Sequence, residues 1–300
     1  MELRQLEYLV AVAEEASFTR GAARVHVAQP GVSAQIRRLE RELGQELFDR
    51  TGRTVTMTEA GTAVLLYARV ALAAVAGARA AVDELTGLLR GRLTIGTLTS
   101  ISSPRLDLTA LLAAYHRDHP AVQITLTVGD SSLLAGGVGD GRYDVAFIGL
   151  ASSPPVGIAT HVITDEPLVV VVPPEDPLAR RTSLPMAALA GLPLISLPAG
   201  AGLRAALEAA SAAAGFTPRV AFEGEDPRVL AELAAHGLGP AVIPRSLADA
   251  RADRLHAIRL TRPEPRARLA LAWRAEGPVS PAAREFITRV RRAGAGVPAS

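Results

Sequence analysis

The chain of 300 residues contains no cysteine. This absence excludes disulfide bonds, zinc–thiolate centres and cysteine nucleophiles, and it fits a reducing cytoplasm. Lysine is absent as well, so all 32 basic residues are arginine, against 30 acidic residues. The formal net charge of +2 does not by itself indicate nucleic-acid binding, which would have to rest on local clusters of charge.

Targeting and membrane-spanning segments are not expected either. The first 15 residues are charged and periodic, whereas a secretory signal peptide has a basic start followed by an apolar core. The most apolar later stretch, residues 70–82, is interrupted by Arg79, and we expect it not to span a membrane. With 49% hydrophobic and 21% charged residues, the sequence predicts a globular cytoplasmic protein of two or three domains without a membrane partner.

Catalytic signatures are few. Neither G-x-S-x-G nor H-E-x-x-H occurs, and the pair His116 and His119 stands at an expected helix end before Pro120, where we expect solvated side chains and no metal. Residues 200–205, GAGLRA, fit the G-x-G-x-x-A dinucleotide fingerprint, with Glu223 ending the next expected strand. An NAD(P)-dependent oxidoreductase is therefore an alternative, but we expect no enzyme, cofactor or metal because no convincing catalytic pair lies nearby.

Residues 17–44 predict two helices with a tight break between them. Ser17 suits the N-cap of the first helix, and Pro30 suits the first turn of the second, which ends before Gly44. Four apolar residues of the second helix share one narrow stripe: Val32, Ile36, Leu39 and Leu43. The opposite side is small, polar and cationic: Pro30, Ser33, Ala34, Arg37, Arg38 and Arg41. This side suits a DNA major groove, although a solvated arginine face of a helical bundle explains it equally well.

Two further elements extend this pattern. Residues 49–58, DRTGRTVTMT, predict a hairpin whose turn is flanked by Arg50 and Arg53, which suits a wing that contacts phosphates; the alternative is a solvated turn. Residues 59–88 predict a helix that is too long to be covered by a small winged domain. We expect this helix to pair with a second copy of the chain, the alternative being packing against its own C-terminal domain.

Beyond residue 90 the pattern changes to strands alternating with helices. The expected strands are 93–98, 122–128, 143–149, 167–173, 193–197, 219–223, 240–244 and 267–273. The expected helices are 104–116, 131–141, 202–214, 227–235 and 281–292, the second of them weakened by glycines at 136–141. This alternation predicts a mostly parallel sheet, and an internal echo of its strands predicts two α/β lobes with a ligand cleft between them.

Two strand-to-helix turns could present free N–H groups to a small carboxylate in this cleft. The first contains Thr99, Ser100 and Ser102, and the second contains Ser196, Gly200 and Gly202. Asp130, followed by Ser131, would bind an effector hydroxyl or amine, or simply cap the next helix. Ordinary helix caps are the alternative for each of these residues.

With these patterns in place, the chain resembles the LysR-type transcriptional regulators. The resemblance is specific over residues 3–61 and looser at GRLTIG, DVAFIG, GFTP and AAHGLGPAVIP, so it covers nearly the whole chain. It implies a winged helix-turn-helix (residues 1–58), a dimerising linker helix (59–90) and a two-lobed, periplasmic-binding-protein-like effector domain (91–300). Lobe I would comprise about 91–161 and 267–300, and lobe II about 162–266.

The resemblance also implies functional residues and partners. The DNA-facing positions fall on Gln29, Pro30, Ser33, Ala34 and Arg37, with Arg50 and Arg53 on the wing. Family members often carry a larger polar residue where this chain has Ala34, which offers only a methyl contact. The implied partners are double-stranded DNA, a small and often acidic metabolite, and further copies in a homodimer or homotetramer, with RNA polymerase as a further candidate.

The sequence therefore predicts a sequence-specific, effector-modulated transcriptional regulator. A solute-binding protein is disfavoured by the helix-turn-helix and by the lack of an export signal.

Overall fold

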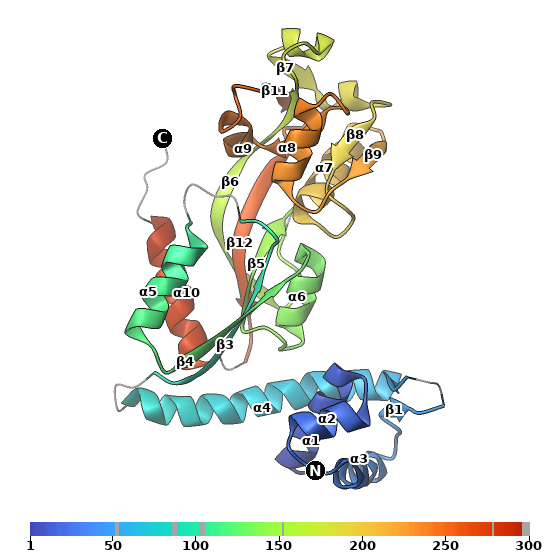
Figure 1. The fold of residues 1–300 in the computed structure, drawn as a ribbon, viewed down its shortest axis with the longest axis vertical. Coiled ribbons are helices and arrows are strands. Elements are labelled where there is room, and N and C mark those ends of the chain that lie inside the picture. Colours follow the sequence, from blue (N-terminus) through green and yellow to red (C-terminus); the bar gives the residue numbers. More distant parts are fainter. Residues whose placement is uncertain (52–53, 86–88, 102–105, 152, 278, 296–300) are drawn as a thin grey trace. The chain divides into compact units, whose positions relative to one another are not determined.

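The computed structural model describes residues 1–51, 54–85, 89–101, 106–151, 153–277 and 279–295. The chain divides into two compact units, one comprising essentially residues 1–89 and the other essentially residues 90–295 (Figure 1).

The first unit consists of helices and one small hairpin. Its elements are α1 (Leu3–Glu15), α2 (Phe18–Arg24), α3 (Gln29–Leu43), β1 (Phe48–Asp49), β2 (Thr56–Met57) and α4 (Glu59–Leu85). Ser17 caps α2 by accepting the N–H of Arg20 at 3.3 Å, and Gly44 ends α3 in the left-handed conformation at φ 70°. The two helices, the hairpin and the long helix that the sequence predicts are thus confirmed, and we call the hairpin the wing.

The core of this unit gathers side chains from α1, α3, the hairpin and α4. Val32, Ile36 and Leu39 are fully buried in it, as their common stripe predicts. Leu43, expected on the same stripe, is 40% exposed because it stands in the last turn of α3, where the chain leaves the core. Edge-to-face packing of Phe18 on Phe48, at 5.3 Å between ring centroids, joins the hairpin to α2.

The second unit is built on one long sheet with the strand order β4-β3-β5-β12-β6-β10-β8-β9, to which β11 and β7 add beside β6. The strands are β3 (Gly91–Thr97), β4 (Val122–Val128), β5 (Val145–Leu150), β6 (Ile158–Val172), β7 (Ser183–Pro185), β8 (Leu194–Ser196), β9 (Val220–Glu223), β10 (Ala241–Pro244), β11 (His256–Thr261) and β12 (Arg266–Arg274). The helices are α5 (Leu108–Asp118), α6 (Ser131–Gly139), α7 (Gly202–Ala213), α8 (Pro227–Ala235), α9 (Arg245–Asp249) and α10 (Pro281–Ala295), with 3-10 turns at Pro177–Arg180 and Met186–Leu189.

Two lobes share this sheet through β6 and β12. Residues 158–167 of β6 pair with β12, whereas residues 168–172 pair with β10 and β11, so β6 runs from one lobe into the other. We call the part around β3, β4, β5, α5, α6 and α10 lobe I, and the part around β7 to β11 and α7 to α9 lobe II. Within the lobes, β3–β4, β3–β5, β8–β9 and β8–β10 are parallel, as expected.

The sequence missed several elements of the connection between the lobes. The strands β6 and β12 are antiparallel to each other and to their neighbours β5 and β10, because the chain crosses to lobe II on β6 and returns on β12. The first half of β6 mixes polar and apolar residues and gives no apolar run, β7 and α9 are short, and β11 mixes polar and apolar residues as well. The expected helix 104–116 is α5, which begins at Leu108 behind an Asp107 cap; its expected first residues fall outside the described part of the chain.

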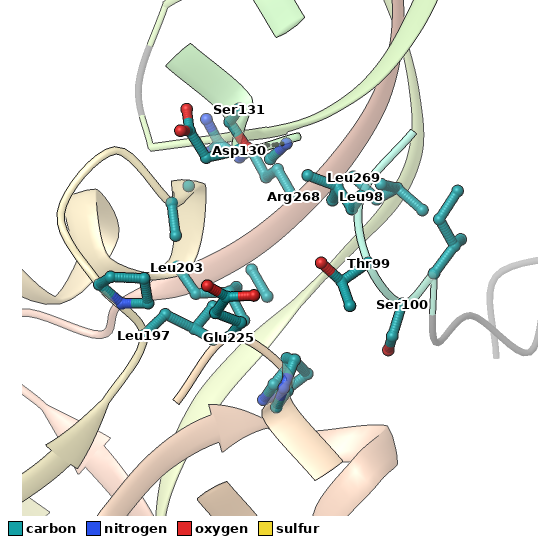
Figure 2. Close-up of a pocket in the computed structure, with 18 of the residues that line it drawn as sticks. Leu98, Thr99, Ser100, Asp130, Ser131, Leu197, Leu203, Glu225, Arg268 and Leu269 are labelled. Carbon is teal, nitrogen blue, oxygen red and sulfur yellow. Dashed lines mark hydrogen bonds between the residues drawn. The ribbon is translucent and has the colours of Figure 1, made fainter. Parts of the chain in front are cut away.

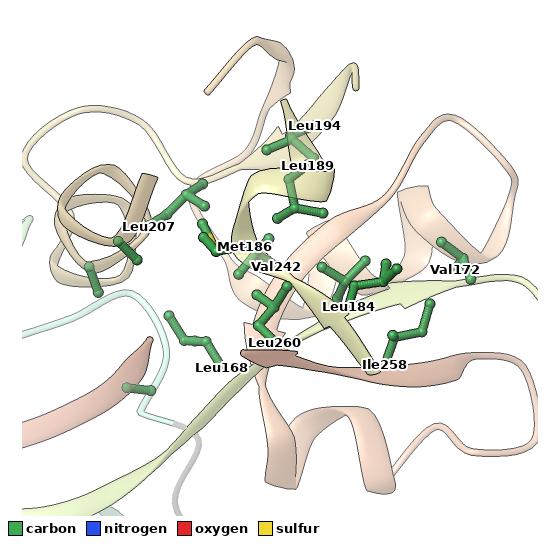
Figure 3. Close-up of a cluster of buried hydrophobic side chains, with 14 residues drawn as sticks. Leu168, Val172, Leu184, Met186, Leu189, Leu194, Leu207, Val242, Ile258 and Leu260 are labelled. Atoms are coloured by element: carbon green, nitrogen blue, oxygen red, sulfur yellow. The ribbon is translucent and has the colours of Figure 1, made fainter. Parts of the chain in front are cut away.

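Alternation along β6 explains how lobe II is packed. Leu168, Val170 and Val172 face a cluster with Met186 and Leu207 (Figure 3). Val169 and Val171 face the opposite cluster, beneath α8 and α9. A strand that is covered on both faces needs a continuous apolar run, which is what the sequence shows here.

Lobe I is covered on both faces as well (Figure 1). α6 packs on one face of its sheet, and on the other the rings of Tyr115, Phe147 and Phe286 stack edge to face. Burial raises the pKa of the Tyr115 phenol, whose hydroxyl donates to the Ala282 carbonyl at 2.9 Å. His119, which we expected to be solvated, packs against the Tyr115 ring at 5.1 Å.

Candidate functional site

The outer side of α3 carries the expected DNA-facing residues. Gln29, Pro30, Ala34 and Arg37 are exposed, and Ser33 is half-buried. The Gln29 amide donates to the Ser33 hydroxyl at 2.9 Å, so these two side chains form one hydrogen-bonded group. A group of this kind offers both donors and acceptors to a base edge.

The arginines near this surface differ in whether they form ion pairs with acidic residues. Arg38 pairs with Glu2 and with Glu42, at 3.4 and 3.3 Å. Arg37 forms no ion pair with any residue that the structure describes, and Arg41 reaches only a backbone carbonyl. Arg37 is therefore a cation that remains available for a phosphate.

The wing arginine Arg50 is held from within the unit. It pairs with Glu40 at 2.8 Å and lies over the ring of Phe18 at 5.1 Å from the centroid, with its side chain 36% exposed. Glu40 is buried and also accepts the Leu47 N–H at 3.0 Å, because a buried carboxylate needs such partners. Glu40 thus joins α3 to the wing; its position four residues after the buried Ile36 is the signal that the sequence offered for this role.

The tip of the wing is described only in part. The Asp49 carboxylate accepts the side chain and the N–H of Thr51, at 2.6 and 2.8 Å, and these hydrogen bonds lower the pKa of Asp49. Arg53 lies outside the described residues, as does Ser102 of the effector turns.

A cavity of about 350 Å³ opens between the two lobes of the second unit (Figure 2). Of the expected effector residues, Thr99, Ser100, Asp130, Ser131 and Gly202 line it. Ser196 is buried away from it. Gly200 lines a second, more open cavity of about 440 Å³, which shares Ser131, Gly149 and Gly202 with the first.

Three helices that begin at this cavity have acidic caps. Asp130 accepts the Leu133 N–H of α6 at 2.8 Å, and Asp226 accepts the Arg228 N–H of α8 at 2.8 Å. Glu166 accepts both the N–H and the hydroxyl of Ser246 in α9, at 2.7 and 2.9 Å. The fourth helix, α7, has no side-chain cap on its first turn.

Sequence reasoning missed three charged residues of the cavity: Glu166, Glu225 and Arg268. Glu166 and Arg268 stand on the connecting strands β6 and β12. The similarity between the two lobes predicted site residues only at the ends of parallel strands. Arg268 pairs with Asp165 at 3.2 Å, and Asp165 also pairs with Arg266 at 2.5 Å.

Beside the cavity, the lobes contact each other through the backbone of Gly149 and Gly202. A Cβ on Gly202 would lie 2.5 Å from the Gly149 carbonyl oxygen, so this position has no room for a side chain, and a Cβ on Gly149 would lie 3.1 Å from the Gly202 Cα, a tight contact. The Ser131 hydroxyl accepts the Gly149 N–H at 2.9 Å, and the Ser132 N–H reaches the Gly200 carbonyl at 3.3 Å. The glycines of the GAGLRA segment thus serve a close contact between lobes.

Two family models match the chain. The bacterial regulatory helix-turn-helix protein, lysR family, matches residues 3–62, and the LysR substrate binding domain matches residues 86–295. The chain belongs to the LysR family. Like its relatives, this LysR-type chain is a DNA-binding transcriptional regulator with an effector-binding domain, and the oxidoreductase alternative is not favoured.

Curated relatives match over most of this LysR-type chain. ShiR of Corynebacterium glutamicum is 36% identical over 250 residues, covering 81% of this chain and 82% of that protein. OxyR of Escherichia coli is 31% identical over 281 residues, covering 93% and 91%.

Solved structures of full-length LysR regulators share the fold. A full-length OxyR from Pseudomonas aeruginosa with a cysteine substitution aligns at a TM-score of 0.75 and 26% identity, covering 98% of this chain and 94% of that one. CbnR in complex with its target DNA aligns at 0.59 and 26%, covering 98% and 100%. The sequence of this LysR-type chain contains no cysteine.

Proposed function

We propose that this regulator reads a dyad-like DNA site through two copies of α3, and that a small molecule in the cavity between the lobes alters the binding or bending of that DNA. The observation that carries the proposal is the exposed face of α3, where Arg37, which has no ion-pair partner among the described residues, stands beside the hydrogen-bonded Gln29 and Ser33. An effector acts here only if it binds one lobe arrangement better than another.

In this proposal the surface has two kinds of contact. Gln29, Ser33 and Ala34 meet base edges, with Pro30 packed beside them. Arg37 meets a phosphate, and so do the wing residues Arg50 and Arg53; Arg50 does so with a charge that Glu40 partly neutralises. In the cavity, the effector contacts Thr99, Ser100, Asp130, Ser131 and Gly202. Ser102, Ser196 and Gly200 were also expected to contact it, but Ser196 and Gly200 do not line this cavity.

A second copy of the chain is the partner that α4 requires. Over Glu59–Arg79 this helix is long and apolar enough, by length and composition, to cross a membrane, yet little of it is buried in the single chain. Tyr67 and Val82 are 73% and 62% exposed. They share a stripe with the small residues Ala74 and Ala78, which permit close helix approach. A homodimer through this stripe places two α3 helices on one DNA, and association of two dimers gives a tetramer.

The remaining parts of the proposal follow from this role. The domains are the winged unit (1–58), the linker helix (59–90) and the effector domain (91–300). The protein acts in the cytoplasm without enzymatic activity of its own, and contacts RNA polymerase at its promoters.

Binding to the DNA upstream of its own gene, followed by fluorescence anisotropy, tests the proposal. We expect specific binding that falls roughly 10³-fold between about 50 and 200 mM salt, because several arginine–phosphate contacts release counterions. The Arg37→Ala variant should bind more weakly on every sequence and show a shallower salt slope. Salt-independent binding would contradict the arginine–phosphate contacts. No binding to any DNA would contradict a regulator and favour a solute-binding protein.

Substitution of Ala34 tests the role of α3 as the reader. The Ala34→Arg variant should select a different base at one position of each half-site, with enrichment changed about tenfold, because arginine pairs with guanine where a methyl group cannot. Selection from a random DNA pool measures this change. The matched control is Gln45→Arg, which adds the same charge at an exposed position beyond the end of α3. Identical selected sites for wild type and Ala34→Arg would show that α3 does not read bases at this position.

A further inference from the structure

The cavity between the lobes is lined by more negative than positive charge. Its ionisable side chains, among the described residues, are Asp130, Glu166 and Glu225 on one hand and Arg268 on the other. Figure 2 shows Asp130 and Arg268 on one side of the cavity and Glu225 and Thr99 on other sides. A ligand held here therefore meets carboxylates from both lobes.

The protein's own carboxylates already stand where an acidic ligand would bind. Helix N-termini attract anions, but α6, α8 and α9 are capped by Asp130, Asp226 and Glu166. The uncapped α7 is approached by Asp130 as well, whose Oδ1 lies 3.2 Å from the place of a Cβ on Gly200, in the turn before this helix. An added carboxylate would meet like charge at each of these positions.

Among the described residues that line the cavity, Glu225 is the carboxylate left without a partner. It lines the cavity, is exposed, and forms no hydrogen bond or ion pair with any residue that the structure describes. Asp130 likewise forms no ion pair within the described chain, and one of its oxygens accepts a single N–H. Both groups are free to receive a cation.

Arg268, the one arginine among the described residues that line the cavity, does not reverse this excess of negative charge. Its Nε bonds to Asp165, which is shared with Arg266. The rest of the lining is mostly apolar, and it includes Leu98, Val128, Leu197, Leu203 and Leu269. The cavity thus combines apolar walls with unpaired carboxylates.

We propose that the effector of this regulator is an apolar small molecule with a cationic amine, which Glu225 and Asp130 bind. The proposal rests on the effector role of the cavity stated above, and it departs from the acidic metabolite that the family resemblance implies. The apolar body fills the leucine-lined walls, and the ammonium group lies between carboxylates of the two lobes. The ligand in this way draws the lobes together.

Three probes of one size and different charge test the proposal: phenethylamine, phenethyl alcohol and phenylacetate. Isothermal titration calorimetry on the full-length protein at pH 7 should show the amine binding about tenfold tighter than phenylacetate, with the alcohol between them. Added salt should reduce the difference in affinity between the amine and phenylacetate, because it screens the charges. Equal or tighter binding of phenylacetate, or no binding of any probe at millimolar concentration, would overturn the proposal.

Variants separate a specific contact from general charge. Glu225→Gln should lower the preference for amine over alcohol several-fold, and the double variant with Asp130→Asn should abolish it, since asparagine still caps α6. The matched control is Glu223→Gln, two residues away, which pairs with Arg204 at 3.0 Å and does not line the cavity. An unchanged preference in the double variant would refute the proposal. DNA binding in the same preparations distinguishes this failure from failure of the regulator role.

Discussion

Gly61→Ala is expected to destabilise the winged unit by about 3 kcal/mol, near the upper end for overpacking in a filled site. An added Cβ would lie 2.0 Å from the Leu47 carbonyl oxygen and 2.8 Å from Met57 Cε, so the backbone itself must move. That movement would break the bonds that seat α4 on the unit, in which Thr58 donates its N–H to Leu47 at 3.1 Å and its hydroxyl to Glu46 at 2.7 Å. Thermal unfolding followed by circular dichroism measures the loss.

A matched glycine provides the control. Gly31 is the third residue of α3, as Gly61 is of α4, but a Cβ there would meet only Val27 Cγ1, at 3.4 Å. Gly31→Ala should leave stability unchanged or raise it by up to about 1 kcal/mol, because alanine favours the helix. If both variants unfold at the wild-type temperature, α4 does not pack closely against the Leu47 carbonyl at Gly61.

Negative charges on the exposed stripe of α4 are expected to prevent dimerisation and so to weaken DNA binding. The double variant Tyr67→Asp with Val82→Asp should convert the dimer to a monomer at micromolar concentration. Its affinity for the full DNA site should fall about 10²-fold or more, because each half-site must then be bound without the help of the other. Light scattering measures the mass and fluorescence anisotropy measures the affinity.

The control places the same charges on the other side of α4. Thr62 and Ala76 are exposed and lie away from the stripe of Tyr67 and Val82. Thr62→Asp with Ala76→Asp should remain dimeric and bind DNA as the wild type does. A wild-type protein that is monomeric at micromolar concentration, or a stripe variant that stays dimeric, would rule out α4 as the dimer contact.

The fold was predictable where the burial of a helix or strand leaves a clear pattern of apolar residues in its own sequence. Val32, Ile36 and Leu39 mark α3 because its inner face has a single period, and residues 168–172 mark a strand buried on both faces because every residue is apolar. Residues 158–166 of β6 gave no such signal, since their surroundings are set by β12, more than a hundred residues later in the chain.

The site was predictable to a similar extent. Asp130 and Gly202 were expected at the cavity because strand-to-helix turns meet at the ends of parallel strands. Glu166 and Arg268 were not, because they reach the cavity from strands that run between the lobes. Glu40 illustrates the same limit at the DNA surface: its helix position suggests burial, but only the fold shows that Arg50 is the cation that accompanies it.

The insertion of β12 between β5 and β6 has a consequence for synthesis on the ribosome. β12 pairs with β5 through Arg268 to Ala272 and with β6 along its whole length, so the sheet of lobe I has no middle strand until residue 274 has emerged. All strands of lobe II, which end at Thr261, are made before that point. Lobe II can therefore assemble during translation. In lobe I, β3 can pair with β4 and β5, but the edges of β5 and of the first part of β6 that face β12 stay unpaired until the last part of the chain arrives. The slow, non-local step of folding falls on lobe I.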